Sequence, residues 1–265
     1  MYEKMLCLIN KIRFKLEKNK WKRSFKNYQL LEGALTKKEP GLIKLLTNDG
    51  LKINIRQNIF DARIIREVFI NKQYDLNVIL PEDPVIVDIG GYIGDFSIYA
   101  AKYLEAKKII VYEPIMENFE LLNLNIADNK FTDIITSVNK AVGRHEQLKI
   151  YVQKMENNEI HASSHFYKSA EERLVESITL NELIQNHQID VIDLLKIDCE
   201  GNEYEILLSA DNYLFNKIRN IVFEYHKTDN YEQKLAGLLK KLKFLNYKII
   251  KKRSLIYAKK HYQPN

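Results

Sequence analysis

The chain has 265 residues, 46% of them hydrophobic, which is enough for one sizeable core. Its net charge of +6 is unevenly placed: residues 1–26 hold nine Lys or Arg and two Glu, a net of +7, so the rest of the chain carries a net of −1. A nucleic-acid enzyme more often spreads positive charge over its body, so this distribution disfavours that class.

Other functional classes are also disfavoured by composition. No run of 18 apolar residues occurs, and the N-terminus lacks the apolar stretch and small-residue cleavage site of a secretory signal, so neither a membrane span nor export is expected. The two cysteines, Cys7 and Cys199, are far apart and make no disulfide framework. A reducing, cytoplasmic location fits best.

The first segment of the chain is expected to be a basic amphipathic helix. Apolar residues recur there at spacings of three and four, with lysines between them: Met5, Leu8, Ile9, Ile12 and Leu16. Such a helix can pack on the body with its charged face in solvent, or it can contact an anionic membrane surface or a partner. We expect a basic arm with a linker at residues 1–49 and a folded domain at residues 50–265.

From Val85 onward, strand and helix patterns alternate, which predicts an α/β fold with a mostly parallel, Rossmann-like sheet and helices on both faces. The continuous apolar run "VIVDIG" is typical of a strand buried on both faces. The expected strands are 85–90, 108–114, 134–143, 191–198 and 220–226, with an extra strand at 148–154. The expected helices are 95–104, 116–126, 178–185, 203–209 and 231–243. A C-terminal hairpin over 247–260, turning at Arg253 and Ser254, should add an antiparallel strand.

The turn after the first strand, "VDIGGYIGDF", combines a carboxylate with three glycines: Asp88, Gly90, Gly91 and Gly94. Glycines let the backbone approach a ligand closely, and the following helix N-terminus offers unpaired N–H groups. A dinucleotide fingerprint needs glycine at relative positions 1, 3 and 6, but Tyr92 and Asp95 occupy the second and third of these. A nicotinamide-dependent oxidoreductase is therefore disfavoured.

The acidic residues around this turn favour a different cofactor. Asp88 and Asp95 flank the turn and could face a cationic or amino group. Glu113 ends the second strand, 23 residues after Gly90, where a carboxylate can accept hydrogen bonds from two ribose hydroxyls. A single ribose with a positive centre and no pyrophosphate describes S-adenosylmethionine.

Four segments stand in a familiar order: "VIVDIGGYIGDFSIYAAK", "VYEPIMENFELLNLNI", "NKAVG" and "LLKIDCEGNEYEIL". In this order they resemble the FkbM-type methyltransferases, a branch of the class I S-adenosylmethionine-dependent enzymes. The segment upstream, with Arg56 and Asp61, is similar to that family's lead-in, and the resemblance covers roughly residues 50–226. It implies a class I methyltransferase domain over residues 50–265. Many members methylate hydroxyls of sugars or secondary metabolites, and the acceptor varies.

The resemblance also implies a set of cofactor contacts. The methionine and ribose end would lie against Asp88, Gly90, Gly91, Tyr92 and Gly94. Glu113 would hold the ribose hydroxyls, and Asn139 and Ala141 would sit near the adenine.

Acidic residues and a histidine follow two strands that should be neighbours. Asp198 and Glu200 end the fourth strand, and Glu224 and His226 end the fifth. Because ligands bind beyond the carboxyl ends of parallel strands, these groups should face the cleft. The proton of an acceptor hydroxyl could go to His226, Asp198 or Glu200, and histidine has the intrinsic pKa that suits this task best. Asp198 could instead pair with the sulfonium or the amino group of the cofactor.

The residues around these acids have other expected roles. Glu203 opens the next helix, where negative charge is favourable, and is expected to be partly structural. Cys199 should point to the other face of the strand as a buried spacer. The acids with His226 could also bind a divalent cation such as Mg²⁺ or Mn²⁺, although nothing in their spacing requires it.

A polar segment, "HASSHFYKSAEERLVESITL", is expected to be a loop between strands. It is either a solvated connection or a cover over the acceptor, and its candidate residues are His161, Ser163, Ser164 and His165.

The sequence thus predicts a cytoplasmic S-adenosylmethionine-dependent methyltransferase, which acts on a hydroxyl of a glycan, a glycolipid or a small metabolite. Its residues 1–26 could also hold it at the inner face of the membrane. Two alternatives stay open: an RNA methyltransferase that grips RNA with the basic arm, and a non-catalytic domain that binds the cofactor.

Overall fold

The computed structural model describes residues 2–34, 41–74, 78–144, 146–154, 160–163 and 171–261, and a seven-stranded sheet is the centre of this described part. The strands, in spatial order, are β12 (Tyr247–Lys252), β13 (Leu255–Lys260), β11 (Asn220–Glu224), β10 (Leu194–Ile197), β3 (Val85–Ile89), β4 (Lys108–Tyr112) and β5 (Ile135–Val138). The five strands from β11 to β5 are parallel, and β13 is antiparallel to both of its neighbours. The predicted Rossmann-like fold with a closing hairpin is confirmed.

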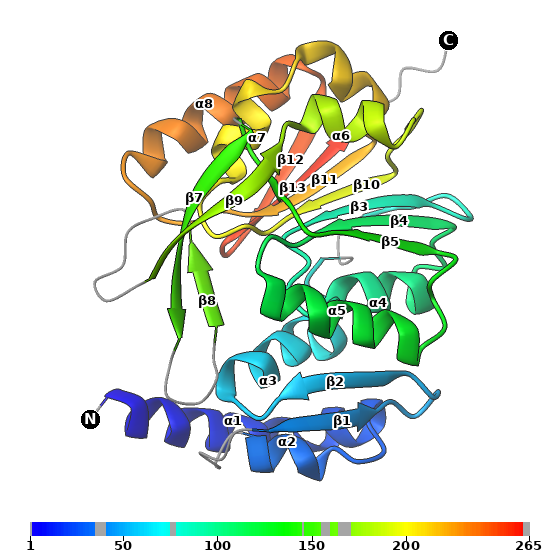
Figure 1. Ribbon diagram of the computed structural model, residues 1–265, viewed down its shortest axis with the longest axis vertical. Coiled ribbons are helices and arrows are strands. Elements are labelled where there is room, and N and C mark those ends of the chain that lie inside the picture. Colours follow the sequence, from blue (N-terminus) through cyan, green and yellow to red (C-terminus); the bar gives the residue numbers. More distant parts are fainter. Residues whose placement is uncertain are drawn as a thin grey trace.

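Helices cover both faces of the sheet (Figure 1). One face carries α4 (Asp95–Tyr103) and α5 (Met116–Asp128), and the other carries α6 (Leu180–Asn186), α7 (Glu203–Ser209) and α8 (Tyr231–Phe244), with the short 3-10 helix η2 (Asn212–Lys217). Because helices cover both faces of the sheet, all four residues of β10 are buried. Each is either apolar or paired with an opposite charge, as burial on both faces of a parallel sheet requires. None of the helices in the described ranges has the length and apolar character needed to cross a bilayer.

The N-terminal segment folds as a layer beneath α4 and α5 (Figure 1). Its elements are α1 (Tyr2–Ser24), α2 (Gln29–Ala34), β1 (Leu42–Leu46), β2 (Lys52–Arg56), α3 (Ile59–Ile65) and the π-helix η1 (Arg66–Ile70). Trp21 and Phe25 are buried in the same apolar cluster as Phe96 of α4. Asn125 of α5 binds both backbone groups of Asn54 in β2. Because β1 and β2 form an antiparallel hairpin, the expected division between residues 49 and 50 falls inside its turn.

The strand predicted over residues 134–143 is interrupted. β5 ends at Val138, and β6 (Ala141–Val142) belongs to a second sheet, where it pairs with β9. The Asn139 side chain donates hydrogen bonds to the carbonyl oxygens of Glu113 and Pro114, which fixes the chain where it leaves the central sheet.

The second sheet corrects the loop predicted over residues 161–180. Its order is β6, β9 (Glu171–Ile178), β7 (Gln147–Lys154) and β8 (Ile160–Ser163). Strand β7 was predicted, but β9 was not, and α6 begins only at Leu180, after Thr179 caps it with Glu182. Because β9 pairs with β7, its charged side chains can interact with opposite charges on that strand. The Glu172 carboxylate, for example, lies 2.9 Å from the Lys149 ammonium. Ser164 and His165 lie outside the described residues.

Candidate active site

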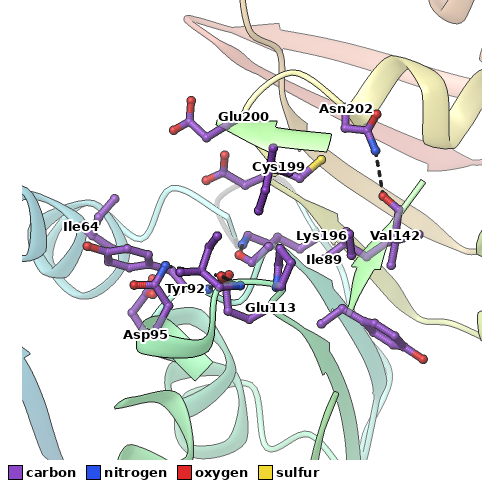
Figure 2. A pocket seen from close by; sticks show the side chains of 18 of the residues that line it. Ile64, Ile89, Tyr92, Asp95, Glu113, Val142, Lys196, Cys199, Glu200 and Asn202 are labelled. Carbon is purple, nitrogen blue, oxygen red and sulfur yellow. Dashed lines mark hydrogen bonds between the residues drawn. The ribbon is translucent and has the colours of Figure 1, made fainter. Parts of the chain in front are cut away.

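A pocket lies at the carboxyl ends of β3, β4 and β10, the edge where open α/β sheets bind ligands. Its walls come from the turns after these strands, from α3 and η1, and from the second sheet. Figure 2 shows Tyr92, Glu113 and Lys196 near the centre, with Cys199 and Glu200 on one side and Val142 on another. The predicted site residues Gly90, Tyr92, Glu113, Ala141, Asp198 and Glu200 are among those that line it, together with Asp95.

The turn after β3 depends on Gly90. Its φ of 82° is in the left-handed region, and a Cβ there would lie 1.8 Å from the carbonyl oxygen of Asp198. The turn and the end of β10 therefore approach each other as closely as only a glycine permits. Gly91 and Gly94 do not line the pocket; a Cβ on either would meet Leu122, so these two glycines permit the close packing of this turn against α5.

Glu113 is held directly beside this turn. Its Oε2 accepts a hydrogen bond from the backbone N–H of Tyr92 at 2.9 Å, and its Oε1 accepts one from the N–H of Ile115 at 2.9 Å. The side chain of Asn118 donates to the same Oε1 at 3.4 Å. Burial raises the pKa of Glu113 to about 7, although these hydrogen bonds oppose the rise. Oε2, which accepts only one of these bonds, keeps a second lone pair that can accept from a ligand in the pocket.

A buried ion pair supports Tyr92 from below. Arg56 and Asp61 are both buried, with 3.2 Å between Nε and Oδ2, and Oδ1 of Asp61 accepts a hydrogen bond from the Tyr92 hydroxyl at 2.6 Å. The Arg56 guanidinium carbon lies 5.0 Å from the centre of the Tyr92 ring, and Nη1 donates to Asn118 at 2.8 Å. Tyr92 has a φ of 48°, an unfavourable value for a residue with a side chain. The ion pair therefore holds the strained residue whose N–H binds Glu113.

Replacement of Asp61 by alanine should lower the free energy of unfolding by about 3 to 5 kcal/mol, because it leaves the Arg56 cation buried without its partner. Chemical denaturation measures this loss. The matched control is Glu172→Ala, which breaks an exposed pair and should leave the free energy of unfolding nearly unchanged. Equal stability of the two variants would contradict the supporting role of Asp61.

Asp88 lies beneath the pocket and does not line it. The carboxylate is fully buried, accepts a hydrogen bond from the Ser97 hydroxyl at 2.7 Å, and lies 2.9 Å from the Lys196 ammonium. Lys196 in turn donates to the carbonyl oxygen of Gly90 at 2.7 Å. Burial lowers the pKa of Lys196, but the charges of Asp88 and Asp198 outweigh this and raise it above its ordinary value. Asp88 therefore acts on the glycine turn through Lys196.

Carboxylates dominate the charge of the pocket on the side of β10. Asp95, Asp198 and Glu200 line it, and the Tyr74 hydroxyl donates to Oδ2 of Asp198 at 2.7 Å. Burial raises the pKa of Asp95 to about 8, although Lys196 opposes the rise, so the Asp95 carboxyl is mostly neutral at pH 7 and adds little negative charge to this surface. Such a surface favours a ligand that carries positive charge.

His226 lies at the rim of the pocket, among acids. Strands β10 and β11 are neighbours, as predicted, so His226 Nε2 comes to 3.4 Å from Oε2 of Glu200 and 3.9 Å from Oδ1 of Asp198. Behind the ring, Glu203 is fully buried; its Oε1 accepts from the backbone N–H of His226 at 2.7 Å and lies 3.3 Å from Nδ1. Burial lowers the pKa of His226, but the hydrogen bond to Glu203 and the nearby negative charges outweigh it and raise the pKa to about 10.

Glu203 does more than its position at the start of a helix predicts. Its second oxygen, Oε2, accepts from the N–H of Gly201 at 2.9 Å. One carboxylate thus fixes both the turn after β10 and the histidine after β11. Glu224, predicted beside His226, accepts from the Ser254 hydroxyl at 2.8 Å, and burial raises its pKa to about 7.

Two further predictions concern Cys199 and Asn139. Cys199 was expected to be a buried spacer on the other face of the strand. It packs against the apolar cluster of that face, as predicted, but it is only partly buried and also lines the pocket, and burial raises the pKa of its thiol. Asn139 does not line the pocket, whereas Ala141 does, as does Ile150 of β7. Within the described ranges, no three His, Cys, Asp or Glu side chains are arranged to hold a metal ion.

Comparisons of the sequence with known proteins point to one family. A family model described as "Methyltransferase FkbM domain" matches residues 88–249. Methyltransferase sdnD of Sordaria araneosa is 25% identical over 225 residues, which cover 74% of this chain and 86% of that protein. Methyltransferase 1 of Beauveria bassiana is 27% identical over 181 residues, which cover 61% and 72%. The crystal structure of methyltransferase FkbM from Methylobacillus flagellatus KT has a TM-score of 0.46 and 16% identity, and the match covers 70% of this chain and 46% of that one.

Proposed function

This chain belongs to the FkbM family of S-adenosylmethionine-dependent methyltransferases, and on that premise we propose that it methylates a hydroxyl group of a glycan, a glycolipid or a small metabolite. The observation that carries the proposal is the group of proton-accepting side chains at the rim of the pocket, His226 with Asp198 and Glu200. An alcohol barely ionises at neutral pH, so a hydroxyl acceptor needs such a group, whereas a more acidic acceptor does not.

The pocket has the chemistry that the cofactor requires. The Glu113 carboxylate beside the Cβ-free Gly90 turn suits a ribose, and Ala141 with Ile150 offers apolar contact for an adenine. Asp198 lines the same pocket, which supports its pairing with the amino group or the sulfonium of the cofactor. The bound cofactor supplies an electrophilic methyl group on a positively charged sulfur. The task of this chain is then to hold the acceptor oxygen in line with that carbon and to remove its proton.

The protonation of His226 limits which form of the protein can react. With a pKa of about 10, His226 is an imidazolium at neutral pH and cannot accept a proton. Positive charge bound beside Asp198 would offset one of the carboxylates that raise this pKa and would shift the ring toward its neutral form, while Glu203 and Glu200 continue to raise the pKa. We therefore assign proton removal to Nε2 of His226 in the fraction of loaded enzyme whose ring is neutral, a fraction that grows as the pH rises, with Glu203 as the positioning residue behind it.

The two alternatives meet specific obstacles. An RNA acceptor would bring phosphates to a pocket whose lining includes the carboxylates of Glu67 and Glu200, and like charges repel. A non-catalytic binding domain would have no use for a buried carboxylate that fixes a histidine at the rim, as Glu203 does. Both observations favour the enzyme with a small or glycan acceptor.

A labelling experiment tests the acceptor class. The protein is incubated with methyl-labelled S-adenosylmethionine and an extract of the source cells, which is then separated into RNA, protein, glycolipid and small-molecule fractions. We expect the label in a glycan, glycolipid or small-molecule fraction, and we expect it to survive mild alkali, because methyl ethers are stable where methyl esters are not. Label that ribonuclease releases, or that alkali removes as methanol, would overturn the proposal.

A further inference from the structure

The N-terminal helix α1 carries an apolar stripe that the body of the protein does not cover. Ile9, Ile12 and Leu16 are 45%, 52% and 81% exposed. At 3.6 residues per turn, their positions fall within about 60° of one another around the helix. Exposed single apolar residues are common, but three in register on one helix face form a contact surface.

A different face of α1 holds the helix to the protein. Trp21 is buried, and Phe25, just after the helix, packs edge-on against Phe69 of η1 with 5.9 Å between ring centres. Glu17 lies 4.0 Å from Arg66, the first residue of η1. Packing on the body therefore accounts for the C-terminal half of α1, and it leaves the stripe open.

The charge around the stripe identifies its partner. Residues 1–26 have a net charge of +7 while the rest of the chain has a net of −1. Among the described side chains, Lys15 and Lys20 are exposed on either side of Leu16 around the helix. A helix with a short apolar stripe flanked by lysines lies in the interface of an anionic bilayer, where the stripe enters the acyl boundary and the lysines meet lipid phosphates.

We propose that α1 is a docking helix for an anionic membrane surface. The inference does not depend on the acceptor proposed above. The π-helix η1 links this surface to the active site: it holds α1 through Arg66 and Phe69, and it lines the pocket through Glu67 and Val68. Docking of α1 therefore brings one wall of the pocket close to the lipid headgroups. Figure 1 shows α1 at the edge of the molecule beyond β1, away from α8 and β12.

Flotation of the full chain with vesicles tests this proposal. Vesicles of phosphatidylcholine alone are compared with vesicles that also contain phosphatidylserine. The stripe variant carries Ile12→Glu and Leu16→Glu. The control carries Ile79→Glu and Phe244→Glu, which are 72% and 78% exposed, so it makes the same change of charge and polarity elsewhere on the surface. Binding of S-adenosylhomocysteine by both variants checks that the fold is intact.

We expect the wild type and the control to float with the anionic vesicles, and the stripe variant to bind them about tenfold or more weakly. Binding of the wild type should fall as salt rises, because the lysine contribution is screened. The proposal is overturned if the stripe variant floats like the wild type, if anionic lipid gives no advantage, or if the wild type binds single-stranded RNA through the stripe and ignores vesicles.

Discussion

Replacement of Glu113 by glutamine should weaken the binding of S-adenosylhomocysteine about a hundredfold, which titration calorimetry would measure. Two backbone N–H groups, those of Tyr92 and Ile115, point at the two oxygens of this carboxylate. An amide can accept only one of these bonds and must turn its NH₂ group toward the other donor. The ribose hydroxyls lose a charged acceptor in the same change, so the glycine turn and the ligand are both affected.

The pH dependence gives this prediction a second readout. The pKa of Glu113 is about 7, so the carboxyl group is mostly neutral at pH 6 and mostly ionised at pH 8. The ionised form is the stronger acceptor, and the affinity of the wild type should rise over this range. The Glu113→Gln variant has no carboxyl group at this position and should show a smaller rise, because only Asp95, whose pKa is about 8, then ionises in the pocket over this range.

Asp193 offers a matched control at the opposite edge of the sheet. It is also a buried carboxylate, and it accepts a hydrogen bond from the backbone N–H of Val85 at 2.9 Å and one from Arg219 at 2.6 Å. Asp193→Asn should cost stability but leave the affinity for S-adenosylhomocysteine unchanged. If both variants bound the ligand equally well, Glu113 would not be the ribose acceptor.

The parts of the fold that the sequence predicts are those that local pattern determines. The strand 85–90 is a continuous apolar run before a glycine turn, and the hairpin at 247–260 is marked by two strand patterns around a short turn. Strand β9 cannot be predicted from local pattern, because its sequence, "EERLVESI", is rich in charge. It becomes a strand through pairing with its antiparallel partner β7. The hairpin of β1 and β2 likewise gains its place through α5, by contacts such as that of Asn54 with Asn125.

The same distinction applies to the site. That Glu113 and Gly90 meet follows from a general rule, because neighbouring parallel strands end at one edge of the sheet. The roles of Glu203 and Arg56 follow from no such rule. Glu203 reaches His226 only because the chain turns back at Gly201, where φ is 111°. Arg56 reaches the site from a layer whose position depends on tertiary packing, so the sequence offered only a resemblance for it.

The second large effect concerns His226. Replacement by alanine should lower the methyl-transfer rate by about a hundredfold to ten-thousandfold, the range for loss of a general base, and should leave the affinity for S-adenosylhomocysteine close to that of the wild type. The side chain is at the rim and does not line the pocket around Glu113, which is why binding should survive. The rate is measured with the acceptor that the labelling experiment identifies. An unchanged rate would remove His226 from the proposed mechanism.

Glu203→Gln distinguishes a positioning residue from one that only supports the fold. Glutamine keeps an oxygen that can accept from the His226 N–H, but it loses the bond from the Gly201 N–H and removes the negative charge behind the ring. Because the hydrogen bond to Glu203 and the nearby charges raise the pKa of His226 to about 10, the titration of this imidazole, followed by NMR in the cofactor-free protein, should move to lower pH in the variant.

The pH dependence of the methyl-transfer rate then tests whether His226 is the base. A neutral imidazole is the form that accepts a proton, so the activity of Glu203→Gln should begin to rise at a lower pH than that of the wild type, even if its maximum is smaller. The control is Glu172→Ala, which removes a carboxylate of the second sheet that pairs with Lys149 and should shift neither the titration nor the pH profile. A profile that stays in place while the NMR titration moves would show that the base is another group, and Glu200, 3.4 Å from His226, would be the next residue to replace.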